Sequence, residues 1–264
     1  MSVRLYALTC GWLTLPEAAL IEGGDPAPIR IPVPAYLIVH PRGTALFDSG
    51  LAEICSAAPS LERDAYLGSL AGQVRVERAS ADAIESRLES VDVDVARVDW
   101  LINSHLHLDH AGGNGRVSGA RLLVQRREWE AAHEADLIEA MTYKPVDYDH
   151  GHDLCLVDGE HDVFGDGSVC CIPTYGHTPG HQSLRVRHAG GEAVLAGDAC
   201  YLKEMLASLR LPPGAAWDRE AMREALIRLR DLERRGARIF FGHDPAFWAT
   251  LPQAPAPVGQ KAAQ

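Results

Sequence analysis

The sequence lacks any apolar run near the roughly 20 residues that a membrane-spanning helix requires, although hydrophobic residues make up 47% of its 264 residues. Residues 1–16 also lack the apolar core and cleavage site of a secretory signal peptide. The six cysteines are scattered, with one adjacent pair and no Cys-x-x-Cys motif. Because such cysteines are expected to be reduced thiols, we predict a cytoplasmic protein without a membrane contact.

Basic charge is scarce as well. The chain has 25 Lys and Arg against 36 Asp and Glu, which gives a net charge of −11. A chain this acidic repels a phosphate backbone, and no local basic patch offsets the repulsion. The charge balance therefore argues against nucleic acid as a substrate. The oligomeric state stays open between a monomer and a homodimer.

Strand-like and helix-like segments alternate along the chain. Strands are predicted where apolar and β-branched residues cluster, and helices where apolar residues recur every three or four positions. The predicted strands are 3–9, 34–40, 44–47, 98–102, 121–125, 168–172, 183–186, 193–196 and 238–241, and the predicted helices are 80–88, 126–140 and 218–234. This pattern predicts an α/β fold with β-sheet packed between helices.

The segment 218–234 is the clearest helix. Asp218 can cap its N-terminus, and Gly236 lies just beyond its end. Its apolar stripe consists of Met222, Leu226 and Leu229.

No linker interrupts the middle of the chain, so we predict one domain over residues 1–251. The last residues, 252–264, have no large apolar periodicity, and we predict that they form a disordered tail.

Twelve histidines are the unusual count, and the most informative of them lie in SHLHLDHAGGNG, residues 104–115, directly after a predicted buried strand. His105 and His107 are two apart and share one face of an extended chain. Asp109 and His110 are adjacent, so they point in different directions. One metal ion cannot comfortably bind all four from so short a segment. Two neighbouring ions can, if the two histidines serve one and the Asp109–His110 pair serves the other.

Three more candidate ligands stand beside glycines after later predicted strands. They are His177, Asp198 and His243. Imidazole and carboxylate suit zinc and other divalent first-row ions. A lone His-x-His pair would carry little weight, but five histidines and two aspartates at successive strand ends indicate a metal centre.

These residues, in this order, resemble the metallo-β-lactamase superfamily, and within it the chain is similar to the N-acyl homoserine lactonase family. The resemblance is carried by residues 104–115, by HTPGHQS at 177–183, by Asp198 with Tyr201 three residues later, and by FFGHD at 240–244. It covers nearly the whole chain. It implies an αββα sandwich, in which helices flank two mixed β-sheets that hold the metals at one edge.

By motif position, the resemblance implies two divalent metal ions per chain, with zinc as the default. The first would be bound by His105, His107 and His177, the second by Asp109, His110 and His243, and Asp198 would bridge both. Asp109 and Tyr201 are the two candidate catalytic residues. In the family, a tyrosine at the position of Tyr201 donates a hydrogen bond to the lactone ester.

Such a metal pair has a definite chemistry. Two divalent ions about 3.5–4 Å apart can hold a bridging hydroxide. Two carboxylates and the hydroxide leave one net positive charge, which favours an oxyanion developing on an attacked carbonyl. We therefore predict a metal-dependent lactonase that opens the ring of N-acyl homoserine lactones and so degrades quorum-sensing signals.

Other functions stay open. The same scaffold could hydrolyse another lactone, an ester, a thioester, a β-lactam or a phosphoester, although the net charge disfavours a nuclease. A non-catalytic metal-binding module is a further alternative, and the full ligand set argues against it.

Several remaining side chains receive weaker predictions. We expect His181 to support a turn or a ligand rather than to bind metal, and Cys200 to be a small core residue. We expect a solvent-exposed group of histidines, His133, His150, His152 and His161, and an acyl-chain groove lined by Trp12, Leu13 and Leu15.

Overall fold

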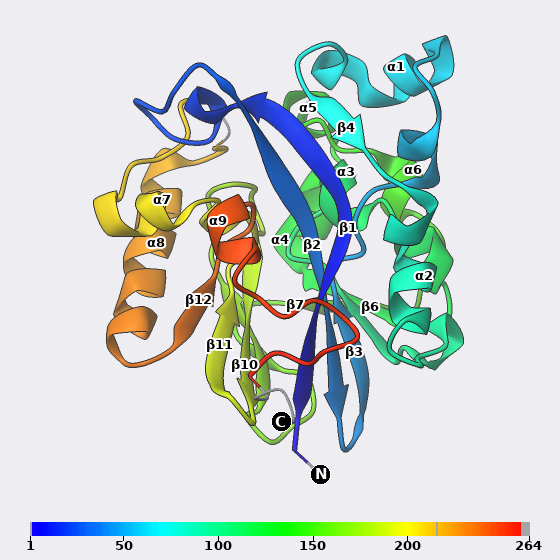
Figure 1. Cartoon of the computed structure of the whole chain (residues 1–264), viewed down its shortest axis with the longest axis vertical. Helices are drawn as coiled ribbons and strands as arrows, with labels where there is room; N and C mark the ends of the chain where they lie inside the picture. The colour runs from blue at the N-terminus through cyan, green and yellow to red at the C-terminus, as the bar shows by residue number, and fades with distance from the viewer. Residues whose placement is uncertain (1, 215, 260–264) are drawn as a thin grey trace.

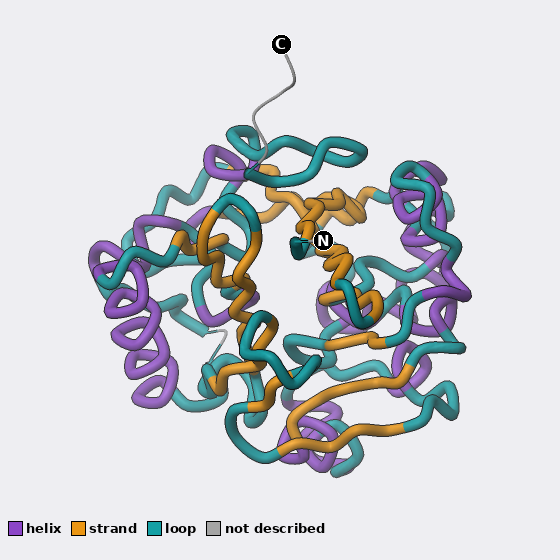
Figure 2. The backbone as a smooth tube through the Cα atoms, turned by 90° about the horizontal axis from the view of Figure 1, so that it is seen from below, coloured by secondary structure: helices purple, strands orange, loops and turns teal. Residues whose placement is uncertain are grey.

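The computed structural model describes residues 2–214 and 216–259. Two β-sheets pack face to face, and helices cover their outer faces (Figure 1). Seen end-on, the strands lie between two helical layers (Figure 2). The predicted αββα arrangement of two mixed sheets flanked by helices is confirmed.

The first sheet has the strand order β4-β1-β2-β3-β5-β6-β7. Its strands are β1 (Arg4–Pro16), β2 (Pro28–His40), β3 (Gly43–Phe47), β4 (Arg75–Glu77), β5 (Trp100–Ile102), β6 (Arg121–Gln125) and β7 (Leu154–Val157). β1 pairs antiparallel with β2 and β4, and β2 with β3, whereas β3, β5, β6 and β7 run parallel. The β2–β3 hairpin closes at the His40–Gly43 pair, where the sequence predicts a turn.

The second sheet has the order β12-β11-β10-β9-β8. Its strands are β8 (His161–Asp162), β9 (Val169–Pro173), β10 (Gln182–His188), β11 (Gly191–Leu195) and β12 (Arg238–Phe240). All neighbours pair antiparallel except β11 and β12, which are parallel. β9, β11 and β12 therefore end at the same edge of this sheet.

Short helices connect the strands. They are α1 (Leu61–Leu67), α2 (Ile84–Glu89), α3 (Leu108–Ala111), α4 (Arg126–Ala131), α5 (Ala135–Ala140), α6 (Pro145–Tyr148), α7 (Lys203–Ser208), α8 (Arg219–Arg234) and α9 (Pro245–Trp248). The 3-10 turns are η1 (Glu17–Ala19), η2 (Glu53–Ser56), η3 (Gly68–Leu70), η4 (Ser80–Asp82), η5 (Val95–Arg97), η6 (Asn114–Val117) and η7 (Gly197–Ala199). The predicted single helix 126–140 is wrong, because it is divided into α4 and α5.

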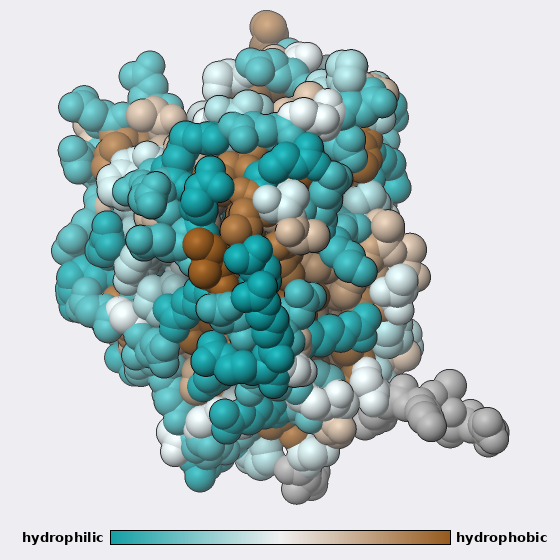
Figure 3. Space-filling model, turned by 90° about the vertical axis from the view of Figure 1, so that its left-hand side faces the viewer, coloured by the Kyte–Doolittle hydropathy of each residue, from teal (hydrophilic) through white to brown (hydrophobic). Residues whose placement is uncertain are grey.

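The predicted long helix is α8. Asp218 Oδ1 accepts hydrogen bonds from the backbone N–H groups of Glu220 and Ala221, both at 3.0 Å, which confirms the cap. Its apolar stripe packs on the second sheet through Met222, Ala225, Leu226 and Leu229. The face of the molecule where α7 and α8 lie is largely hydrophilic, with a group of apolar residues near its centre and others toward its edges (Figure 3).

Side chains that alternate along the strands divide the core into layers. On β5, Ile102 faces the layer between the sheets, where it joins Phe47 and Leu195. Its neighbour Leu101 faces the opposite layer, which includes Leu88 of α2. Both faces of the central strands are therefore buried, as their continuous apolar sequences predict.

The segment after α9 corrects the expected tail. The backbone N–H of Ala254 donates to Ala7 O at 3.1 Å, and that of Val258 donates to Leu5 O at 2.7 Å. The Val258 side chain is buried in the layer between the sheets. The prediction of disorder is thus wrong for residues 252–259, because backbone pairing with β1 supplies order that the local sequence does not signal. Residues 260–264 lie outside the described part of the chain.

The helices of the described segments are each too short or too polar to cross a bilayer.

Candidate metal centre

The predicted ligands come from segments that follow four strands. His105 and His107 follow β5, and Asp109 and His110 lie on α3 directly after them. The other three follow strands of the second sheet: His177 comes after β9, Asp198 lies on η7 after β11, and His243 comes after β12. The structure brings all seven together in two adjacent clusters.

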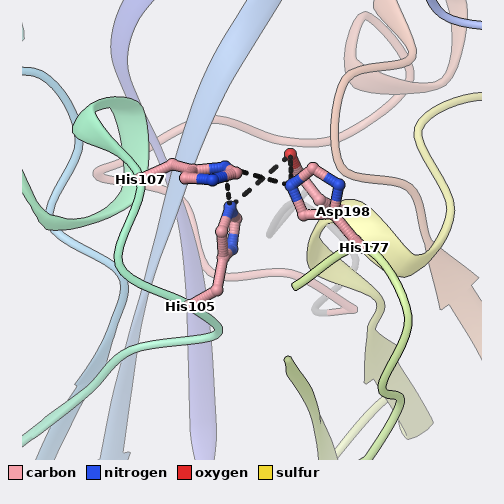
Figure 4. Close-up of side chains that lie close together, drawn as sticks. All are labelled: His105, His107, His177 and Asp198. Atoms are coloured by element: carbon pink, nitrogen blue, oxygen red, sulfur yellow. Dashed lines mark hydrogen bonds and ion pairs between the residues drawn. The ribbon is translucent and has the colours of Figure 1, made fainter. Parts of the chain in front are cut away.

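The first cluster contains His105, His107, His177 and Asp198. His107 Nδ1 lies 3.0 Å from His105 Nε2 and 3.1 Å from His177 Nε2. Asp198 Oδ2 lies 3.8 Å from His105 Nε2 and 3.4 Å from His177 Nε2. The four side chains enter from three segments, with His105 and His107 on the same one, and point their ligand atoms at one another (Figure 4).

The second cluster contains Asp109, His110 and His243. Asp109 Oδ2 lies 3.6 Å from both His110 Nε2 and His243 Nε2. Asp198 Oδ1 lies 3.1 Å from each of the same two nitrogens. Asp198 therefore presents one carboxylate oxygen to each cluster.

These separations fit bound divalent cations. A tetrahedral ion with ligands at about 2.0–2.1 Å separates its ligand atoms by about 3.3 Å. The separations within the two clusters, 3.0 to 3.8 Å, lie on either side of that value. Imidazole nitrogens and carboxylate oxygens are also the donor set that zinc and related ions prefer. Both clusters thus have the spacing and chemistry of divalent-metal sites.

Burial and neighbouring groups keep His105 and His107 of the first cluster neutral, so that their ring nitrogens can donate lone pairs to a metal ion. Burial lowers the pKa of His105 well below its usual value, and the neighbouring His110 and His107 lower it further. The pKa of His107 is also well below its usual value, because of burial and then of His177. Both rings are neutral near pH 7, which is the form that binds a metal.

In the second cluster, neighbouring carboxylates stabilise the charged forms of the two histidines. Burial opposes the charged form of His110, but the charges of Asp198 and Asp109 outweigh it and raise the pKa of His110 well above its usual value. The pKa of His243 is raised by Asp198 in the same way, against the effect of burial. Burial would raise the pKa of Asp198, yet His110 and His243 hold it well below its usual value. The same carboxylates would stabilise a divalent cation.

Two groups that the sequence analysis missed orient these rings. Asp48, at the end of β3, has its Oδ2 2.9 Å from His110 Nδ1, and its Oδ1 accepts from Ser104 N–H at 2.7 Å. It adopts a positive φ of 60°, which is costly for a residue other than glycine. The Pro32 carbonyl lies 2.8 Å from His243 Nδ1. The sequence feature that could have indicated a role for Asp48 is its position at the end of a predicted strand, directly before Ser49.

Tyr201 lies at the same centre. Its hydroxyl is 3.0 Å from His177 Nδ1, and its ring centroid is 5.7 Å from that of His243. Burial and then the charges of Asp198 and Asp109 raise the pKa of Tyr201 well above 10, so that its hydroxyl stays protonated near pH 7. The side chain can therefore donate a hydrogen bond to a bound oxygen.

The weaker predictions have mixed outcomes. His181 is fully buried beside the first cluster, where its Nε2 accepts from Asp198 N–H at 3.0 Å, and Cys200 is a buried core residue, as predicted. His133 and His150 are exposed. His152 is buried instead, with 8% of its surface exposed, so that its predicted exposure is wrong.

One cavity of about 560 Å³ opens onto both clusters. Its wall is mainly apolar and includes Leu13, Leu15, Leu20, Ile31, Val74 and Val76. At its polar end lie His107, Asp109, His177, Asp198, Tyr201 and His243. Leu13 and Leu15 line it as predicted. Trp12 does not, and its ring instead lies under the guanidinium of Arg30 at 3.9 Å.

Comparison with known proteins agrees with the fold and the site. The family model of the metallo-beta-lactamase superfamily matches residues 29–243. This segment contains all seven clustered residues and most strands of both sheets. The chain is a member of that superfamily.

Relatives within the superfamily are similar over almost the full length. The chain is 33% identical over 261 residues to the N-acyl homoserine lactonase AttM of Azorhizobium caulinodans, which covers 96% of this chain and 97% of that protein. It is 30% identical over 245 residues to the N-acyl homoserine lactonase AiiA of Bacillus thuringiensis subsp. kurstaki, covering 91% and 93%. The chain therefore belongs to the N-acyl homoserine lactonase family.

The solved structure of an N-acyl homoserine lactone hydrolase superposes closely on this chain. It has the product N-hexanoyl-L-homoserine bound at its catalytic metal centre. The TM-score is 0.85 at 28% sequence identity, and the alignment covers 98% of this chain and 100% of the other.

Proposed function

We propose that this protein opens the lactone ring of N-acyl homoserine lactones at a centre of two divalent metal ions, and so degrades quorum-sensing signals. The observation that carries the proposal is the pair of clusters that share Asp198 at the polar end of an apolar cavity. His105, His107 and His177 would bind the first ion, Asp109, His110 and His243 the second, and Asp198 both. Zinc is the expected metal, since its ligand preferences match this donor set.

The relatives support the choice of substrate. AttM and AiiA are named for activity on N-acyl homoserine lactones, and the superposed hydrolase holds a product of that reaction. The apolar wall of the cavity suits an acyl chain, while its polar end suits a lactone and an amide.

When bound, two divalent cations would supply an activated water as nucleophile and an electrophilic centre for the carbonyl. Two side chains then complete the reaction. Tyr201, kept protonated by burial, donates a hydrogen bond to the carbonyl or ring oxygen of the substrate. Asp109 lines the cavity, with Oδ2 directed at His110 and His243; it would accept the proton that the attacking water releases and pass it to the ring oxygen that leaves. The product is an N-acyl homoserine, with a free hydroxyl and a carboxylate.

The wider setting forms part of the same proposal. The scattered, unpaired cysteines favour a cytoplasmic location. The partner is a small-molecule lactone, which the protein would hydrolyse as a monomer or a homodimer. The net charge of −11 disfavours nucleic acid as a partner.

The decisive experiment measures acid release with a pH indicator. Purified protein is given N-hexanoyl and N-decanoyl homoserine lactone, and in parallel a thioester, a β-lactam, a phosphoester and a simple lactone without an acyl chain. We expect the acyl homoserine lactones to give the highest kcat/KM, and a chelator to abolish the activity. Faster turnover of another ester, thioester or lactone would replace the proposed substrate with that class. Retention of both metals with no hydrolysis of any compound would instead indicate a non-catalytic binding protein.

A further inference from the structure

Glu128 is a fully buried acidic residue that belongs to neither cluster. It lies on α4, between the exposed Arg127 and the partly exposed Trp129, and none of its surface reaches solvent. Burial of a carboxylate without partners is strongly unfavourable, so its surroundings must compensate. Burial raises the pKa of Glu128, and the hydrogen bonds donated to it oppose that rise.

The carboxylate accepts four hydrogen bonds, two on each oxygen. Oε1 accepts from Leu106 N–H at 3.0 Å and from the hydroxyl of Tyr143 at 2.9 Å. Oε2 accepts from the hydroxyl of Thr178 at 2.7 Å and from Gly180 N–H at 2.9 Å. Four is the full capacity of an ionised carboxylate.

Three of these four donors lie on the two loops that carry the histidines of the first cluster. Leu106 stands between His105 and His107, on the loop after β5 of the first sheet. Thr178 and Gly180 follow His177, on the loop after β9 of the second sheet. One carboxylate therefore connects loops from both sheets. The Tyr143 ring adds a further contact, with its centroid 5.4 Å from that of His107.

The backbone of Glu128 packs closely against the loop that carries His177, Thr178 and Gly180. A Cβ atom at Gly180 would lie 2.2 Å from the backbone nitrogen of Glu128, so that only glycine permits this approach. The second cluster has different partners, since His110 is held by Asp48 and His243 by Pro32. Among the described residues, the four hydrogen bonds to the Glu128 carboxylate come from Leu106, Tyr143, Thr178 and Gly180, so its influence is directed at the first cluster.

We propose that Glu128 is the positioning residue of the first metal site. By fixing both loops, it sets the distances at which His105, His107 and His177 converge. The inference rests on the metal centre proposed above and assigns it a residue that touches neither metal nor substrate.

The substitution Glu128→Gln tests this with little change in volume. Its amide NH₂ group cannot accept hydrogen bonds, so it must face two donors, either those of Leu106 and Tyr143 or those of Thr178 and Gly180. One loop is then released whichever way the amide turns. Outer partners of metal ligands typically change metal affinity by about 10- to 100-fold.

The experiment is a titration of the metal-free full-length chain with Co²⁺ in competition with a chromophoric chelator. Binding is followed by visible absorption, and thermal unfolding is measured on the same samples. E130Q, an exposed change on the same helix, is the control. H177A, which removes one ligand atom, identifies the binding step of the first site. We expect E128Q to weaken that step by about 10- to 100-fold and to leave the other within about twofold of E130Q.

Two results would overturn the inference: affinities in E128Q equal to those of E130Q at both steps, or equal weakening of both steps together with a lower Tm. If E128Q does not fold, T178V removes one of the four donors and is expected to weaken the same step by a smaller factor. Absence of tight Co²⁺ binding in the unmodified chain and in E130Q would instead contradict the proposed metal centre itself.

Discussion

At the scale of single residues, Tyr201 offers the sharpest test of chemistry as distinct from metal binding. Its hydroxyl lies 3.0 Å from His177 Nδ1, and burial keeps it protonated. We expect Tyr201→Phe to lower kcat about 10- to 100-fold, the value of one hydrogen bond to a developing charge, with metal content unchanged. Steady-state kinetics and metal analysis measure the two effects separately. Tyr6→Phe, at a buried tyrosine outside the cavity, is the control, and equal kcat in both variants would remove the proposed role.

The buried carboxyl group of Asp147, on α6, should make the stability of the folded protein depend on pH. It accepts a hydrogen bond from the Tyr66 hydroxyl at 2.8 Å. Burial raises the pKa of Asp147 to about 7, although the bond from Tyr66 and the charge of Lys144 oppose the rise. The unfolded chain has the ordinary pKa of about 3.9, so the folded chain binds this proton more tightly. The stability contributed by the proton is complete below about pH 4 and is lost as the pH rises through about 7.

Asp147→Asn should remove this dependence. Between about pH 4 and pH 8, the free energy of unfolding of the natural chain should fall by a few kcal/mol relative to the variant, at about 1.4 kcal/mol per pKa unit. Urea unfolding across that range measures it, with the exposed Asp149→Asn as control. Parallel pH curves for the natural chain and Asp147→Asn would show that the carboxyl has an ordinary pKa.

The sequence predicts residues of the site only where the residue type itself is informative. Histidines and aspartates after strands stand out, and the structure brings the seven predicted ligands together. Glu128 gives no such signal, because a glutamate on a helix beside Arg126 and Arg127 reads as a solvent-exposed residue. Its burial can be inferred only from Ala131 and Ala132, three and four positions later. These residues lie on the same side of the helix as Glu128 and are buried.

At the scale of elements, α8 is the helix whose packing can be tested by two adjacent residues. Leu226 is fully buried against the second sheet, whereas the next residue, Ile227, is 38% exposed. We expect Leu226→Ala to lower the free energy of unfolding by about 2–5 kcal/mol, through lost burial and the cavity left behind. Ile227→Ala should cost less than about 1 kcal/mol. Urea unfolding compares the two, and similar losses would contradict the assigned orientation of α8.

Elements with strong local signals are predicted well, and those that depend on distant contacts are not. Asp218 and the apolar stripe define α8 from the sequence alone. The break between α4 and α5 has no glycine or proline to announce it. The order of residues 252–259 comes from pairing with β1, some 250 positions earlier in the chain, and no local pattern can signal such a partner.

At the scale of the whole molecule, the metal centre exists because two sheets meet. The first sheet supplies His105, His107 and α3, and the second supplies His177, Asp198 and His243. Neither sheet alone holds a complete set of ligands for either cluster. Metal binding should therefore stabilise the assembly of the two sheets as well as provide the chemistry.

The most direct test is the number of metal ions bound per chain after exhaustive dialysis, measured for the natural protein and for Asp198→Ala. Because Asp198 presents one oxygen to each cluster, 3.1 Å from His243 Nε2 on one side and 3.4 Å from His177 Nε2 on the other, its loss should affect both sites. We predict two ions per natural chain and fewer than one in Asp198→Ala, with lactone hydrolysis lost in parallel. Fewer than two ions in the natural protein, or an unchanged count in the variant, would contradict the account.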